Sequence, residues 1–350
     1  MAESVTVVAL SLERGDKPGF ARVAYVSLRK QATALRRKNP VCTDLVTALL
    51  LVAGIVACAG SPTGALPSPL PEALPGTVEL VASAHGSHVR YVPADLASPP
   101  PLVVLAHGTP GDGETAEDAA RYYVEHWKAW AEAQGAILIA PAFDQANFGS
   151  KQVDMAHGGY RGLFGREVGA DAWVIELVDA YTARYGLAGG RFYLYGHSAG
   201  GQFAARFLVT HPERLQGAVI SAAVTYPHPD GGIAWPFGLG SFEATLQWAD
   251  PPGQTSARVE PDPATWLAGV QVPAVVVVGL NDLEPQLAWP GQRATNRVTI
   301  ARDWVAEMEA WAGAQGVESR IGLSMIPGLG HSAYGLLPHC QQAMAGILAE

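Results

Sequence analysis

The chain of 350 residues is 49% hydrophobic and 16% charged, so it can bury the core of a large folded domain. Its net charge is −9 and no basic patch lies beyond the N-terminal segment, which argues against nucleic acid as a partner. The three cysteines, Cys42, Cys58 and Cys340, have no metal-ligand spacing and form no paired framework. No cluster of His, Asp, Glu or Cys has ligand spacing either, so we expect neither a metal nor another cofactor.

The first part of the chain, residues 1–57, has the features of a signal sequence rather than of a folded domain. Basic residues gather between Arg29 and Lys38, and the run Leu45–Ala57 contains no charged side chain. That run has the length of a signal-peptide h-region and is shorter than the roughly 20 residues that span a bilayer. The segment ahead of it is long for an n-region, which is consistent with a start codon downstream of Met1.

The uncharged run ends in Ile55-Val56-Ala57-Cys58, which resembles the lipobox of bacterial lipoproteins. The resemblance implies cleavage before Cys58, lipidation of its thiol, and anchoring on the periplasmic or extracellular side of a bacterial membrane. An uncleaved signal-anchor helix in which Cys58 is incidental is the alternative. Residues 58–76 contain five prolines and are expected to form an extended tether, and without residues 1–57 the net charge is −13.

From residue 77 to residue 350 the pattern predicts one catalytic domain in which strands alternate with helices. Two β-rich runs around Gly86-Ser87 predict an antiparallel hairpin, and the later apolar runs are typical of buried parallel strands. The alternation predicts a mostly parallel central sheet flanked by helices on both faces. Strands are expected at Thr77–Ala84, His88–Val92, Leu102–Ala106, Ala136–Ala140, Phe192–Tyr195, Gly217–Ala223, Val272–Gly279 and Ile321–Ile326, and helices at Ala116–Gln134, Asp171–Tyr185, Gln202–Leu208, Val298–Ala314 and Cys340–Leu348.

Two segments between these elements have the composition of binding loops rather than of short connectors. Phe143–Gly165 is long, polar and rich in glycine. Tyr226–Gly269 is rich in proline, glycine and tryptophan, and we expect an irregular, small lid-like insertion there. Ligands bind at the carboxyl ends of parallel strands, so we expect these two segments to determine substrate specificity.

The stretch Arg191–Leu208 contains a short apolar strand, the pattern Gly196-His197-Ser198-Ala199-Gly200 and a helix. A serine at such a sharp turn is held in a strained backbone conformation, beside amide groups that can stabilise negative charge. The pattern alone is weak in a chain with 39 glycines, and a plain glycine-rich turn is the alternative. The flanking strand and helix favour Ser198 as a nucleophile.

A serine nucleophile needs a base within hydrogen-bond reach and a carboxylate that orients the base. In this kind of sheet the three follow in the order serine, acid, histidine. Asp282 lies just after the valine-rich strand, and His331 lies just after the strand Ile321–Ile326. We therefore expect Ser198, Asp282 and His331 to form a catalytic triad, with Glu284 as the alternative acid.

The tetrahedral intermediate of acyl transfer also needs two N–H donors aimed at its oxyanion. One is expected from the backbone of Ala199, the residue after the nucleophile. The second is expected from Thr109, which follows His107-Gly108 in the loop after the strand Leu102–Ala106. A simple tight turn at His107-Gly108 is the alternative reading of that motif.

These motifs together resemble those of α/β-hydrolase fold proteins, over roughly residues 77–350. Within that superfamily the chain is most similar to secreted esterases of the polyhydroxybutyrate-depolymerase and feruloyl-esterase type. The sequence shows neither the disulfides nor the substrate-binding modules that such enzymes often carry, so small or soluble esters are the expected substrates. The residues that carry the resemblance are Leu105-Ala106-His107-Gly108, Gly196-His197-Ser198-Ala199-Gly200-Gly201, Asp282 and Gly330-His331.

The function expected from these residues is serine-dependent hydrolysis of carboxylic esters. Ser198 attacks the carbonyl, His331 takes and returns the proton, and Asp282 orients His331. A serine peptidase of the same fold is one alternative, because a triad by itself does not distinguish esters from amides. A catalytically silent lipoprotein that uses the fold as a binding module is another, although the complete triad argues against it.

Overall fold

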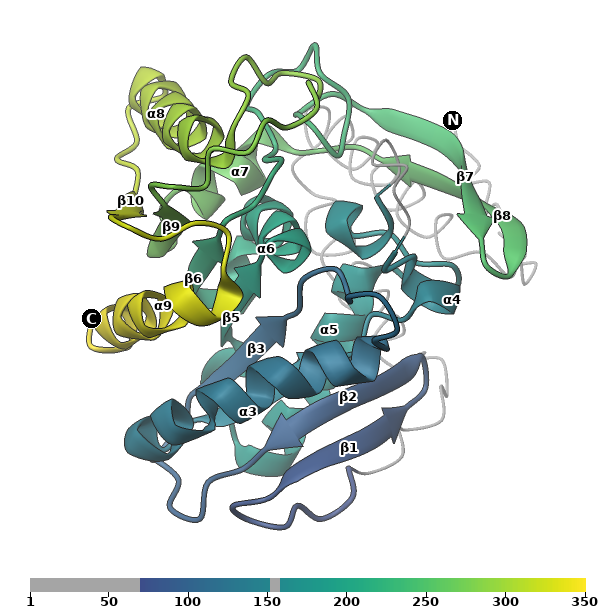
Figure 1. Cartoon of the computed structure of the whole chain (residues 1–350), viewed down its shortest axis with the longest axis vertical. Coiled ribbons are helices and arrows are strands. Elements are labelled where there is room, and N and C mark those ends of the chain that lie inside the picture. Colours follow the sequence, from purple (N-terminus) through teal and green to yellow (C-terminus); the bar gives the residue numbers. More distant parts are fainter. Residues whose placement is uncertain (1–69, 152–157) are drawn as a thin grey trace, which may run out of the picture. The chain divides into compact units, whose positions relative to one another are not determined.

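The centre of the molecule is a sheet of eight strands (Figure 1). The computed structural model describes residues 70–151 and 158–350. In chain order the strands are β1 (Val78–Ser83), β2 (Gly86–Tyr91), β3 (Leu102–Ala106), β4 (Ile137–Pro141), β5 (Phe192–His197), β6 (Leu215–Ser221), β9 (Ala274–Gly279) and β10 (Ile321–Ile326). Their order across the sheet is β1-β2-β4-β3-β5-β6-β9-β10. β2 pairs antiparallel with β1 and with β4, whereas the remaining neighbours are parallel, so the predicted hairpin and mostly parallel sheet are confirmed.

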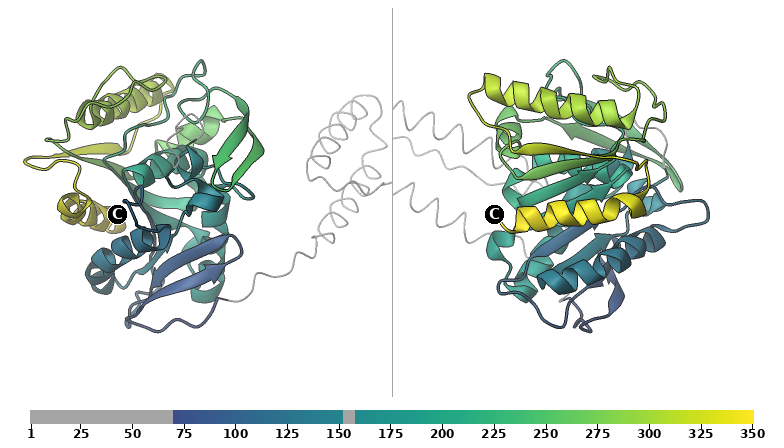
Figure 2. Two further views of the ribbon diagram at one scale, coloured as in Figure 1. Left: turned by 45° about the vertical axis from the view of Figure 1, so that its right-hand side comes forward. Right: turned by 60° about the vertical axis from the view of Figure 1, so that its left-hand side comes forward.

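Helices cover both faces of this sheet, as the sequence predicts. They are α3 (Ala116–Gln134), α4 (Gln145–Phe148), α5 (Ala170–Tyr185), α6 (Ala199–Thr210), α7 (Pro263–Gly269), α8 (Arg297–Ala314) and α9 (Ala333–Leu348), with short 3-10 turns η2 (Gly159–Gly162), η3 (Ala188–Gly190) and η4 (Pro212–Arg214). α3 and α9 pack on one face, and α5, α6, α7 and α8 pack on the other. The right-hand view of Figure 2 shows α3 and α9 side by side in front of the strands.

The central strand β3 shows how the sequence produces two cores. Leu102, Val104 and Ala106 face the core on the α5 and α6 side, whereas Val103 and Leu105 face the core on the α3 and α9 side. Because successive side chains point to opposite faces of a sheet, a strand buried on both faces must be apolar throughout. The unbroken run Leu-Val-Val-Leu-Ala meets that requirement, and its five residues are all buried.

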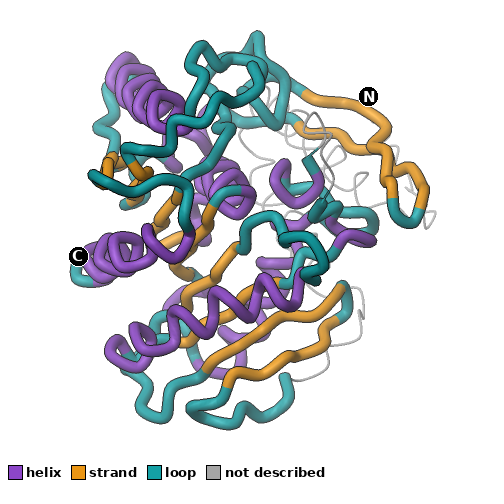
Figure 3. The backbone as a smooth tube through the Cα atoms, viewed as in Figure 1, coloured by secondary structure: helices purple, strands orange, loops and turns teal. Residues whose placement is uncertain are grey.

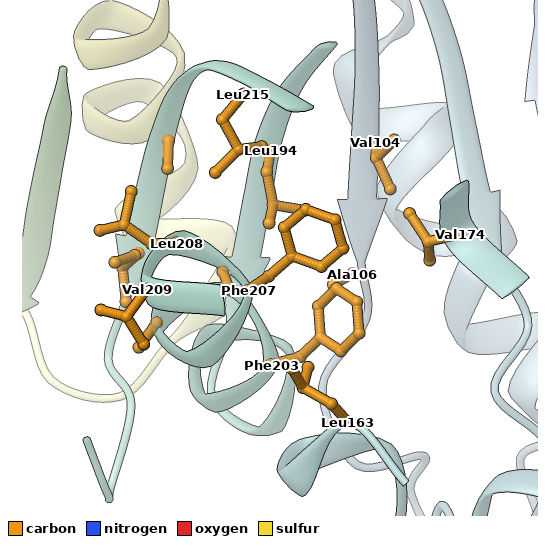
Figure 4. Close-up of a cluster of buried hydrophobic side chains, with 14 of the residues drawn as sticks. Val104, Ala106, Leu163, Val174, Leu194, Phe203, Phe207, Leu208, Val209 and Leu215 are labelled. Carbon is orange, nitrogen blue, oxygen red and sulfur yellow. The ribbon is translucent and has the colours of Figure 1, made fainter. Parts of the chain in front are cut away.

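α6 is anchored by aromatic side chains on the face that it turns to the sheet. Phe203 and Phe207 are fully buried, and Figure 4 shows them beside Leu194 of β5 and Val104 of β3. Burial of a phenylalanine contributes about 1.5–3 kcal/mol each. This packing fixes the helix against the sheet, and therefore also fixes the turn from which the helix begins.

Local signals in the sequence account for the bounds of α3, which the structure gives as predicted. Thr115 and Asp118 form a capping box at its start. Gly135 ends the helix in the left-handed conformation, with φ of 59°, where its N–H bonds the carbonyl of Ala131.

The insertion Tyr226–Gly269 is more regular than the sequence analysis expects. It contains an antiparallel hairpin of β7 (Phe242–Ala249) and β8 (Pro252–Val259), followed by α7. Figure 3 draws this hairpin as a pair of orange strands apart from the central sheet. β7 alternates half-buried or buried residues with exposed ones, whereas β8 reads PGQTSARV and lacks the hydrophobic alternation that would reveal a strand.

The last helix begins earlier than predicted. α9 starts at Ala333 rather than at Cys340 and contains Pro338 in its interior. The proline favours a helix that begins after it, but Ser332 caps the earlier start by accepting a hydrogen bond from the N–H of Gly335. The consequence for the site is that α9 begins two residues after His331.

The end of the predicted tether is held by the folded domain. Arg90, buried on β2, donates hydrogen bonds to the carbonyls of Pro71 and Glu72, and Gly76 donates to the carbonyl of Val92. The folded unit therefore begins before residue 77. The signal sequence, Cys58 and the tether up to residue 69 lie outside the described residues, as do residues 152–157.

Candidate active site

Ser198 sits at the turn between β5 and α6 with φ of 54° and ψ of −112°. Positive φ is rare for a residue with a side chain and costs conformational energy, so the strained serine predicted from the pattern is confirmed. The turn is fixed by a hydrogen bond from the N–H of Ser198 to the carbonyl of Ser221 on β6. It presents the serine hydroxyl at the carboxyl edge of the sheet.

The two glycines of the motif are needed because other backbone segments pack directly against their Cα atoms. A Cβ on Gly196 would lie 2.0 Å from the carbonyl oxygen of Gly200. A Cβ on Gly200 would lie 2.0 Å from the carbonyl oxygen of Ala106 and 2.7 Å from that of His107. Neither position can hold a side chain without moving the backbone, so the motif is explained by close approach rather than by composition.

His331 lies in the loop after β10, the last strand of the sheet, and its ring contacts Ser198. Its Nε2 lies 3.1 Å from Oγ of Ser198, and a third of its side chain is exposed. The loop that carries it is tied to the loop after β9, because the N–H of Asn281 donates to the carbonyl of Leu329 at 2.7 Å. The histidine is thus positioned by the backbone and accessible to a substrate.

Asp282 follows β9 and lies behind His331. Its Oδ2 is 2.8 Å from Nδ1 of the histidine, and its side chain is 2% exposed. Burial by itself raises the pKa of Asp282, but the hydrogen bond from His331 and the charge of Arg297 outweigh burial and hold that pKa below its ordinary value. An ionised carboxylate accepts from Nδ1–H, which leaves Nε2 free to accept the proton of Ser198.

The alternative acid, Glu284, takes no part in this chain of hydrogen bonds. Its side chain is 77% exposed and lies 3.8 Å from Arg297 rather than against His331. The structure therefore brings together Ser198, Asp282 and His331, from three different strand ends.

The two expected oxyanion donors belong to the residue after the serine and to the loop after β3. Ala199 is the first residue of α6, so its N–H has no acceptor within the helix, and no backbone acceptor is found for it in the described part of the chain. Gly108 lies next to the nucleophile, since a Cβ on it would be 3.7 Å from Cβ of Ser198. The following residue, Thr109, has its hydroxyl bound by Nη2 of Arg161 at 2.7 Å.

His107 has a structural part in this loop that the sequence did not reveal. Its Nε2 accepts the N–H of Phe143 at 3.0 Å, so its Nδ1 carries the proton and donates to the carbonyl of Gly108 at 2.6 Å. The Tyr160 hydroxyl donates to the His107 carbonyl at 3.0 Å. Burial lowers the pKa of His107 to about 4, so the ring stays neutral and holds the loop.

Arg161 is the second residue that sequence analysis did not find. It is 5% exposed, and besides Thr109 it donates to the carbonyl of Ser150 at 2.8 Å. No carboxylate pairs with its guanidinium among residues 70–151 and 158–350. Its position in a glycine-rich loop gives no sequence signal, because the contact with Thr109 depends on the fold.

Several other histidines of the described residues contact groups other than Ser198. His211 pairs with Asp171 at 2.8 Å, and His88 contacts the hydroxyl of Tyr181 at 3.0 Å. His197 contacts the hydroxyl of Ser221 at 3.0 Å, and burial lowers its pKa to about 3. His88 and His197 are buried and His211 is paired with an acid, whereas the ring that contacts Ser198 is that of His331.

Within the described ranges no group of three His, Cys, Asp or Glu side chains is arranged to hold a metal ion. Of the helices that the structure describes, none has both the length and the apolar composition to cross a membrane. Cys340 is a buried free thiol, and burial raises its pKa to about 12.

Two solved structures resemble the chain over most of its length. Poly(aspartic acid) hydrolase-1 from Sphingomonas sp. KT-1 is 21% identical, with a TM-score of 0.59 over 77% of this chain and 98% of that chain. The poly(3-hydroxybutyrate) depolymerase LpqC from Bordetella parapertussis is 19% identical, with a TM-score of 0.59 over 74% and 83%. The chain has the α/β-hydrolase fold. No protein-family model and no curated protein matches the sequence.

In an α/β-hydrolase fold the nucleophile, acid and base come from loops at the carboxyl edge of one sheet. Here these loops follow β5, β9 and β10. The resemblance stated from the sequence is therefore confirmed at the level of the fold, and the order serine, aspartate, histidine is the order that this fold uses.

Proposed function

We propose that the chain is a serine hydrolase that cleaves carboxylic esters through an acyl-enzyme. The observation that carries the proposal is the unbroken series of contacts from Asp282 to His331 at 2.8 Å and from His331 to Ser198 at 3.1 Å. The strained backbone at Ser198 supports it, because strain of this kind persists where function requires it. Among the described residues His197 also contacts a serine, Ser221, but no carboxylate hydrogen-bonds that ring.

The geometry supports a two-step reaction. In the first step Nε2 of His331 takes the proton of Ser198 as Oγ attacks the ester carbonyl, and the N–H groups of Ala199 and Thr109 stabilise the oxyanion. His331 then gives that proton to the alcohol as the C–O bond breaks. In the second step a water loses its proton to His331, attacks the acyl-serine, and releases the acid with Ser198 restored.

Esters are proposed ahead of amides because the motifs of the sequence resemble those of secreted esterases. Of the two similar structures, one is a poly(3-hydroxybutyrate) depolymerase, named for a polyester, and the other is a poly(aspartic acid) hydrolase, named for a polyamide. For this chain we propose small or soluble esters. A serine peptidase of the same fold and a silent binding protein are the outcomes against which the proposal is tested.

The test of the proposal is a fluorophosphonate label followed by turnover of matched substrates. We expect covalent labelling of Ser198 and hydrolysis of p-nitrophenyl esters well above that of peptide p-nitroanilides with the same acyl groups. Labelling with faster anilide cleavage would favour the peptidase. If the folded protein shows neither labelling nor turnover, the hypothesis of a silent binding protein is favoured.

We also propose, from the sequence, that the mature protein is attached to a membrane of the bacterial cell envelope by lipid on Cys58. One acyl chain binds membranes only marginally, whereas several on one cysteine hold firmly. The −13 charge of the chain without residues 1–57 is repelled by anionic lipid, so the anchor must supply the attachment. Cys58→Ser should move activity from the membrane fraction to the soluble fraction, or leave an uncleaved precursor. Wild-type protein found in the cytoplasm with residues 1–57 attached would contradict it.

A further inference from the structure

The carboxylate of Asp282 has two partners, and only one of them belongs to the triad. Oδ2 contacts Nδ1 of His331 at 2.8 Å, and Oδ1 accepts a hydrogen bond from Nη1 of Arg297 at 2.9 Å. Arg297 is the first residue of α8 and comes 15 residues after the acid in the chain. Each oxygen is therefore held by a different element, one by the loop after β10 and the other by the start of α8.

This ion pair is enclosed. The side chain of Arg297 is 11% exposed and that of Asp282 is 2% exposed. Nη1 of Arg297 also lies 3.8 Å from Glu284. The side chain of Glu284 is 77% exposed, so solvent largely screens its charge. A buried pair is screened far less, so the charge of Arg297 acts on Asp282 at nearly full strength.

The other titratable groups around the pair are neutral. His197, at the end of β5, has its pKa lowered to about 3 by burial and then by the charge of His331. Tyr226, in the loop after β6, is fully buried, and burial raises its pKa. The start of α9, which follows His331, adds only the partial positive charge of a helix N-terminus. Among the described residues, Arg297 is thus the cation that pairs with the acid from within this enclosed set.

A cation on the triad carboxylate has two opposing consequences for the histidine. It fixes the carboxylate so that Oδ2 faces Nδ1, which favours the reactive tautomer of His331. It also cancels part of the negative charge that would stabilise protonated His331. Removal of the arginine should therefore favour the protonated form of His331 relative to wild type.

We propose that Arg297 is a positioning residue that orients Asp282 and sets the acid limit of activity. The proposal rests on the proposed function, because it assigns Asp282 and His331 to one catalytic unit. Among the described residues, Arg297 makes no hydrogen bond to Ser198 or to His331; its partners are Asp282 and Glu284.

The experiment compares the pH dependence of kcat/KM in wild type, Arg297→Met and Arg297→Lys. In Arg297→Met the full charge of Asp282 acts on His331, so the acid limb should move to higher pH by about one unit. In the same variant the plateau of kcat/KM above the acid limb should fall by about tenfold, because the carboxylate of Asp282 is no longer fixed. Arg297→Lys keeps the charge without the planar fork, so its acid limb should stay near wild type while its plateau falls.

The matched control is Arg302→Met, which removes an exposed arginine from the same helix, where it pairs with Asp303. It should leave both the acid limb and the plateau unchanged. An acid limb at or below the wild-type position in folded Arg297→Met would overturn the proposal. If Arg297→Met fails to fold, Arg297→Gln is compared with Arg297→Lys instead. Acid limbs at the same pH in those two variants would overturn the proposal.

A second readout separates this inference from the proposed function. The ring nitrogens of His331 can be followed by NMR in Ser198→Ala protein, with and without Arg297→Met, where no turnover is needed. The inference expects the ring to titrate at higher pH in the variant without the arginine, whether or not any ester is hydrolysed. An identical titration in the two proteins would overturn it. If wild type shows no turnover but the titration of His331 still shifts, the proposed hydrolase function is contradicted and the inference about Arg297 is supported.

Discussion

Gly200 approaches Ala106 so closely that a Cβ on the glycine would lie 2.0 Å from the carbonyl oxygen of Ala106. The contact joins the first turn of α6 to the end of β3. It brings the helix start, the nucleophile and the loop with Thr109 into one small region. The glycine is therefore a requirement of the backbone around the site.

Gly200→Ala should destabilise the folded domain severely, by about 4 kcal/mol or more, because backbone atoms must move to admit the methyl group. The matched control is Gly346→Ala in α9, where an added Cβ meets no atom within 4 Å. That change should stabilise the protein by about 0.5–1 kcal/mol. Urea unfolding measures both, and a Gly200→Ala variant as stable as wild type would show that the close approach is not real.

Arg161→Met should lower kcat by about 10- to 100-fold with little change in KM, since the variant loosens Thr109 while leaving the triad in place. The control is Arg166→Met, because Arg166 also donates to backbone carbonyls, those of Ala146 and Pro251, but does not contact Thr109. Steady-state kinetics on a p-nitrophenyl ester give the answer. Equal losses in the two variants would assign Arg161 a general structural role.

Stability should fall between about pH 6.5 and pH 4. Burial lowers the pKa of His88 to about 4, that of His107 to about 4 and that of His197 to about 3. Below about pH 6.5 these rings bind protons in the unfolded chain but not in the folded one, so unfolding is favoured by up to about 1.4 kcal/mol per pH unit for each ring. The lowered pKa of Asp282 adds a loss at lower pH, of the same sign.

Urea unfolding at pH 7.5, 6 and 5 measures this slope. His88→Phe should reduce the slope of the free energy of unfolding with pH by the contribution of one histidine. His88 is fully buried, and its Nδ1 has no partner within the described residues. A free energy of unfolding that stays constant or rises as the pH falls from 7.5 to 5 would contradict the burial of these histidines as neutral groups.

The sequence predicted the sheet, and the proximity of Ser198, Asp282 and His331, because these depend on strand ends and short motifs. β3, α3 and β10 have the predicted bounds, since apolar runs and caps are local features. Ser198, Asp282 and His331 were found by their order after strand ends, which depends on topology alone. The hairpin of β7 and β8 was missed because the polar sequence of β8 follows no hydrophobic period.

The residues that support the site could not be predicted in the same way. Arg297 meets Asp282, and Arg161 meets Thr109, only after the chain has folded, and neither lies in a motif. His107 was visible beside the oxyanion loop, but its role depends on the N–H of Phe143, which is 36 residues away. Contacts of this kind are set by packing between elements and leave no local signal.

The central claim is that Ser198 is a nucleophile activated by His331, and the most direct test is the kcat/KM of Ser198→Ala and His331→Ala on the best p-nitrophenyl ester. Each variant should lose about 10³-fold or more while unfolding at the wild-type temperature, and the double variant should lose no more than either alone, because the residues act as one unit. Ser198→Ala should also take no fluorophosphonate label. Near-wild-type kcat/KM in either folded single variant would contradict the account.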